Sequence, residues 1–69
     1  MSRKPLTEVF KGAKDIFDEI MVTWAEFETD SVKAVKKGNK SAARRSRRAT
    51  KKLERLFLTW RKATVKEIG

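Results

Sequence analysis

KKGNKSAARRSRRATKKLER, residues 36–55, combines a turn signal with ten cationic side chains and a single acid. Gly38 follows a helical pattern, and a glycine there favours the left-handed conformation that ends a helix, while the lysines before it suit the negative end of the helix dipole. Asn39 or Ser41 then supplies the side-chain oxygen that caps a second helix. A short segment of this composition between two periodic segments is typical of a helical hairpin. We therefore predict that the chain folds back at residues 38–41.

Both flanks of this turn carry apolar and small residues at alternating steps of four and three, the 3.5-residue period of a coiled coil. The first seam consists of Leu6, Phe10, Ala13, Phe17, Ile20, Trp24, Phe27, Ser31 and Ala34. The second consists of Ala42, Ser46, Ala49, Leu53, Leu56, Trp60 and Ala63. Pro5 suits the first turn of a helix, where its missing N–H costs nothing. We therefore predict helices over residues 6–37 and 41–68.

The two seams agree with each other when the chain is folded at Asn39. Phe17 then faces Trp60. Trp24 faces Leu53, whereas serines and alanines meet near the turn. This agreement predicts an antiparallel, coiled-coil-like pair of helices, with large side chains at the open end and small ones at the turn.

The chain of 69 residues forms a single domain, residues 1–69, with a small core. Below roughly 70–80 residues a single core rarely gives more than ~3–5 kcal/mol. The sequence has no Cys and no His, so it offers no disulfide and no ligand set for a structural zinc ion. Association of two chains remains as a way to bury more apolar surface, and we predict an all-α hairpin that dimerises into a four-helix arrangement. The residues expected in the core or the dimer interface are Phe10, Phe17, Ile20, Trp24, Phe27, Leu53, Leu56, Phe57, Leu58, Trp60 and Val65.

The charge is unevenly placed along the chain. The net charge is +9, composed of −5 over residues 7–32, +10 over residues 33–55 and +4 elsewhere. Such polarity predicts an anionic partner, and arginine binds phosphate oxygens bidentately. The cations expected to bind phosphate are Lys36, Lys37, Lys40, Arg44, Arg45, Arg47, Arg48, Lys51, Lys52 and Arg55. Phosphate contacts carry no base readout, so we expect duplex DNA to be bound with little sequence preference.

No motif of the sequence supports catalysis. There is no His or Cys nucleophile or proton relay, and no G-x-x-x-x-G-K phosphate loop. Asp15, Asp18 and Glu19 lie near lysines at helical spacing, which indicates a solvated face. We therefore expect no enzyme activity, cofactor, metal or small-molecule substrate. No apolar run approaches the ~20 residues that span a bilayer, and no secretory signal opens the chain, so we expect a cytoplasmic protein without a membrane partner.

Four short motifs carry a resemblance to a known family. They are Gly38-Asn39-Lys40, Ala42-Ala43-Arg44, Lys52-Leu53-Glu54-Arg55 and Trp60-Arg61-Lys62. Together they make residues 36–66 resemble the N-terminal domain of the chlamydial linker-histone-like proteins. The resemblance implies a bacterial, nucleoid-associated protein that binds DNA, condenses the chromosome and self-associates through this region. Members usually continue into a basic tail, so either such a tail is missing after Gly69 or the hairpin binds DNA alone.

Several alternatives stay open at the level of the sequence. One is a coiled-coil interaction module whose basic tip docks an acidic protein. RNA is another, because phosphate contacts do not separate the two polymers. A membrane-surface helix is disfavoured, because the large apolar residues match a hairpin core. A DNA-binding dimer would either bridge two duplexes or bend one, and its geometry does not follow from the sequence.

Overall fold

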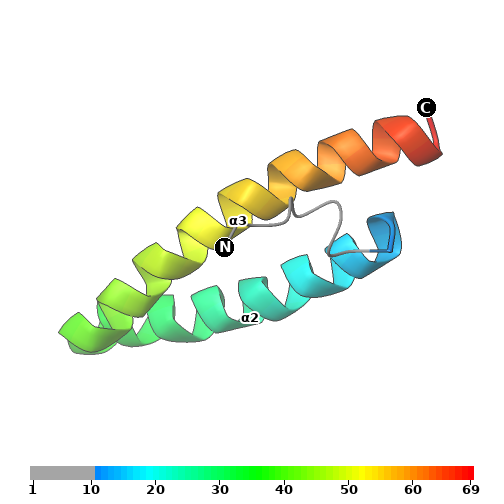
Figure 1. Ribbon diagram of the computed structural model, residues 1–69. Helices are drawn as coiled ribbons and strands as arrows, with labels where there is room; N and C mark the ends of the chain where they lie inside the picture. The colour runs from blue at the N-terminus through cyan, green and yellow to red at the C-terminus, as the bar shows by residue number, and fades with distance from the viewer. Residues whose placement is uncertain (1–10) are drawn as a thin grey trace, which may run out of the picture.

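The computed structural model describes residues 11–69, which form two helices, α2 (Ala13–Lys37) and α3 (Lys40–Glu67). The helices lie side by side in opposite directions, and they separate gradually from the turn toward the open end (Figure 1). The described part of the chain contains no strand. The predicted all-α antiparallel hairpin is therefore confirmed.

The turn is made by Gly38 and Asn39. Gly38 has φ 62° and ψ 28°, the left-handed conformation that glycine adopts without strain, and its N–H donates to the carbonyl of Lys33. The Asn39 side chain accepts a hydrogen bond of 3.0 Å from the N–H of Ala42 and so caps α3. Because the cap lies at the second residue after α2, the turn takes two residues, where the sequence predicted four.

The first helix is shorter than the predicted segment 6–37. Gly12 has extended backbone and precedes α2, whose first residue, Ala13, donates its N–H to Glu67 Oε2 at 2.8 Å. Glycine in a helix interior costs about 1 kcal/mol, which favours a helix that begins after Gly12. The Glu67 carboxylate at the end of α3 accepts the free N–H of Ala13 in the first turn of α2. Phe10 and the rest of the predicted N-terminal part lie outside the described residues.

The seam of α3 forms most of the core. Leu53 and Leu56 are buried, and Trp60 is half-buried at the open end. Near the turn the buried positions hold alanines, Ala42 and Ala49, which let the helices approach closely. The gradual separation of the two helices follows from this change of side-chain size.

The core side of α2 differs from the predicted seam. Ile16 and Thr23 are buried, with 1% and 0% of their surface exposed, whereas Phe17 and Trp24 are 48% and 45% exposed. Trp24, which was expected to face Leu53, is thus nearly half exposed. Ala13 is buried as predicted, but Ile16 and Thr23 are buried in place of Phe17 and Trp24, the residues that follow them, so α2 is rotated slightly from the predicted orientation.

Two ion pairs between the helices accompany this rotation. Lys52 Nζ lies 2.6 Å from Glu19 Oε1, and Arg45 Nε donates to Asp30 Oδ1 at 3.1 Å. With the aromatic seam turned inward, these carboxylates would point away from α3. The observed rotation brings four charges together in two pairs, and two aromatic side chains remain at the surface.

The exposed aromatic side chains gather on one flank of the hairpin. Phe17, Met21 and Trp24 follow each other on one side of α2, and Phe57 lies one turn before Trp60 on α3. Phe17 contacts Trp60 across the helices, with ring centroids 6.1 Å apart, as the folded seams predicted. We call Phe17, Met21, Trp24 and Phe57 the apolar face; each is about half exposed.

Three further residues expected in the core or interface contribute little to the core of a single hairpin. Phe57, Leu58 and Val65 are 45%, 47% and 69% exposed. Ile20 and Phe27, in contrast, are half-buried, and the Phe27 ring lies 5.4 Å from that of Trp24. Large buried side chains are thus few, as expected for a chain of this size.

Thr23 occupies a buried position that an apolar residue would fill. Its hydroxyl has no hydrogen-bond partner within the described part of the chain. Thr59, also buried, donates its hydroxyl to the carbonyl of Arg55 at 2.9 Å. An unsatisfied buried hydroxyl costs about 1–3 kcal/mol, whereas a satisfied one contributes about 1 kcal/mol.

Replacing Thr23 with Val should therefore raise the free energy of unfolding by about 1–3 kcal/mol, because the methyl group keeps the volume and removes the unpaired hydroxyl. The measurement is urea denaturation followed by circular dichroism. The matched control is Thr59→Val, which loses a hydrogen bond and should be neutral or destabilising by about 1 kcal/mol. Equal effects of the two substitutions would contradict this account of Thr23.

Candidate nucleic-acid interface

The ten cations predicted to bind phosphate are all exposed. They extend from Lys36 in the last turn of α2 to Arg55 in the middle of α3. Lys36, Lys37 and Lys40 surround the turn and form the basic tip of the hairpin. The basic stretch is thus a rigid helix with a charged tip and has a fixed shape.

The helical repeat aligns part of this charge in a row. Arg44 and Lys62 are 18 residues apart, as are Arg48 and Lys66, and 18 residues make about five turns. Each pair therefore points in the same direction. With the cations between them they form what we call the outer stripe, about 33 Å long on the side of α3 away from the core: Arg44, Arg48, Lys51, Arg55, Lys62 and Lys66. The sequence prediction did not include Lys62 and Lys66, although their spacing of 18 residues from Arg44 and Arg48 can be read from the sequence.

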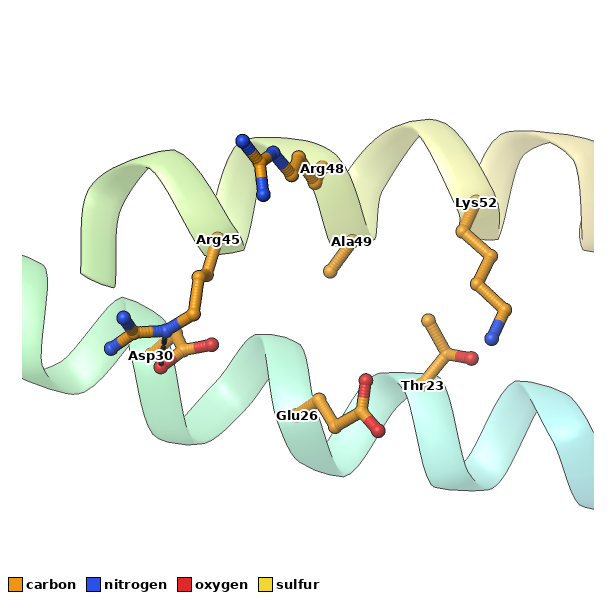
Figure 2. A pocket seen from close by; sticks show the side chains of 7 residues that line it. All are labelled: Thr23, Glu26, Asp30, Arg45, Arg48, Ala49 and Lys52. Atoms are coloured by element: carbon orange, nitrogen blue, oxygen red, sulfur yellow. Dashed lines mark hydrogen bonds and ion pairs between the residues drawn. The ribbon is translucent and has the colours of Figure 1, made fainter. Parts of the chain in front are cut away.

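Acidic residues of α2 border the other side of the basic helix. A shallow groove between the helices is lined by Thr23, Glu26, Asp30, Arg45, Arg48, Ala49 and Lys52 (Figure 2). Arg45 reaches across it onto Asp30, whereas the guanidinium of Arg48 lies against α3, away from the carboxylates (Figure 2). The predicted binding residues are therefore of two kinds, those paired with α2 and those facing solvent.

Ion pairs separate the two kinds clearly. Within residues 11–69 the pairs are Lys14–Asp18, Arg45–Asp30 and Lys52–Glu19. In this part of the chain, therefore, no acid within 4 Å neutralises the outer stripe or the basic tip. The Lys14–Asp18 pair is largely exposed, in keeping with a solvated acidic face.

A comparison with known protein families matches residues 3–68 to the family described as "Histone H1-like protein Hc1". The chain belongs to this family. No curated protein and no solved structure matches it in the corresponding comparisons. The resemblance drawn from residues 36–66 is confirmed, and the match also covers the first helix.

Membership of this family bears on the role of the exposed cations. Histone H1-like proteins are a non-enzymatic, DNA-packaging type, so this member is a histone-like, DNA-binding protein associated with the nucleoid. Neither helix of its described part is long and apolar enough to cross a membrane. The outer stripe and the basic tip are the parts of this histone H1-like chain best suited to phosphate.

Proposed function

We propose that this histone H1-like protein binds duplex DNA with little sequence preference, through the phosphate backbone, and thereby compacts it. The observation that carries the proposal is the row of exposed cations on α3 without acidic partners in the described chain. Cations at this density repel each other, and binding to a polyanion relieves that repulsion. RNA carries the same phosphates, so the binding test includes it.

The outer stripe is about as long as one turn of duplex DNA. A straight stripe about 33 Å long spans one helical turn of about 34 Å, so it reaches phosphates of both strands where they border a groove. Arginine and lysine at steps of three and four residues reach a fraction of these. Such contacts position the protein and read no base edge, which favours binding to any sequence.

A salt titration tests this mode of binding. With about six phosphate contacts, the logarithm of the binding constant should fall against that of salt concentration with a slope of about −5. Duplexes of unrelated sequence should bind equally. Duplex RNA of the same length measures the preference between the polymers. Changing Arg44, Arg48, Lys51 and Arg55 to Gln keeps helix propensity and should weaken binding at least a hundredfold at moderate salt.

The matched control is Lys14→Gln with Arg61→Gln, which removes exposed cations outside the outer stripe and should change affinity little. Circular dichroism checks that both variants remain helical. Unchanged DNA affinity in a folded quadruple variant would reject the outer stripe as the binding site. The basic tip would then be tested against an acidic protein.

We further propose that the apolar face is covered by a second copy of the chain. Exposed aromatic side chains of both helices form it, and the core of one hairpin contains few large residues. A two-fold axis through such a face buries the same residues from both copies. The outer stripe lies on roughly the opposite side of α3, so both stripes of a dimer remain free, and one dimer reaches two duplexes or two segments of one.

Met21→Glu tests the dimer. Met21 is 50% exposed in the hairpin, so a carboxylate there leaves the monomer folded but places two like charges in the shared face. We expect light scattering at tens of micromolar to give a dimer for the unchanged chain and a monomer for the variant. Val22→Glu is the control, because Val22 is 55% exposed and adjacent in sequence but points away from that face. A folded monomer without any substitution would refute the proposal.

A further inference from the structure

Two of the predicted DNA-binding cations, Arg45 and Lys52, already have carboxylate partners on α2. We infer that these two residues hold the hairpin in register and do not contact phosphate, so that DNA lies on the outer stripe and stays off the flank shared with α2. The inference rests on the proposed DNA binding and assigns different roles to neighbouring cations.

The positions of the two ion pairs are suited to fixing the register between α2 and α3. Arg45 and Lys52 are seven residues apart, two turns of α3, and their partners Asp30 and Glu19 are eleven apart, three turns of α2. The two pairs therefore join the same flanks at two separate heights. With one ion pair alone α2 could still rotate relative to α3, whereas two ion pairs fix both the rotation of α2 and its position along α3. That rotation buries Thr23 in place of Trp24.

The surroundings of the pairs repel phosphate. Glu26 lies between Asp30 and Thr23 on the same flank, and its carboxylate has no cation within 4 Å in the described chain (Figure 2). Asp30 is the less exposed partner of its pair, with 16% of its side-chain surface exposed. A phosphate brought to Arg45 would meet both carboxylates. Although the terminal nitrogens of Arg45 remain accessible, its charge is already balanced.

The outer stripe offers the opposite environment. Arg48 lies at the edge of the same groove, but its guanidinium is directed away from those carboxylates (Figure 2). Arg55 follows two turns later on α3, and neither arginine has an acidic partner among residues 11–69. A phosphate bound there displaces only counterions. The number of such contacts can be measured from the salt dependence of binding, because each phosphate contact contributes about 0.9 to the slope of log binding constant against log salt concentration. The two classes of cation are therefore distinguishable by experiment at equal net charge.

The experiment compares two double variants of the chain, each lacking two positive charges. In Arg48→Gln/Arg55→Gln the slope of log binding constant against log salt should become shallower by about 1.8, with an unchanged Tm. In Arg45→Gln/Lys52→Gln the slope should stay within about 0.5 of the original, and the Tm of the free protein should fall by about 5 °C because two ion pairs are lost. Equal losses of slope in both variants would overturn the inference.

A charge-swapped variant provides a second, independent measurement. Glu19→Lys/Lys52→Glu with Asp30→Arg/Arg45→Glu keeps both ion pairs and the net charge but moves the cations onto α2. We expect the Tm and the salt slope of the original chain. A slope reduced by about 1.8 would show that Arg45 and Lys52 contact phosphate and would overturn the inference. Failure of the unsubstituted chain to bind DNA would instead reject the proposed function, so the two failures are distinguishable.

Discussion

The rotation of α2 about its own axis is the constraint on which the rest of this hairpin depends. It places Glu19 and Asp30 against the cations of α3, puts the small side chain of Thr23 into the core and leaves Phe17 and Trp24 at the surface. One flank thereby becomes charged and the other apolar. A different rotation would give the same two helices and the same turn, but neither surface.

This division separates tasks that would otherwise compete. A basic helix that also carried the aromatic residues would offer one surface to both DNA and a second chain. Here the paired carboxylates of α2, Glu19 and Asp30, and the apolar face lie on different flanks, and the unpaired cations of α3 are exposed. The acidic residues of the first helix, which reduce the net charge, thus shape the basic surface by limiting where it is free.

The hairpin, the turn and the seam of α3 could be predicted from the sequence because each pattern allows only one structural interpretation. Gly38 and Asn39 provide local signals, and Leu53 and Leu56 alternate with charged neighbours. The first helix has two readings, because Ile16 and Thr23 fit a heptad as well as Phe17 and Trp24 do. Hydrophobicity favours the aromatic pair, so the sequence prediction chose it. In the structure Ile16 and Thr23 are buried, and Glu19 and Asp30 pair with cations of α3. Such pairs depend on the rotation of the helix and cannot be read from one segment. For the same reason all the cations were expected to be equivalent.

The two-residue turn has a kinetic consequence. Every contact between the helices closes a loop through Gly38 and Asn39, and the loops grow steadily with distance from it, from 15 residues for Asp30 and Arg45 to 54 for Ala13 and Glu67. Short loops close at the least entropic cost, so the hairpin assembles like a zipper, with charged contacts near the turn preceding the larger apolar ones. The far end, where the carboxylate of Glu67 holds the first N–H of α2, closes last and opens first. Fraying of the described hairpin therefore begins at its open end, while the part of α3 next to the turn stays ordered.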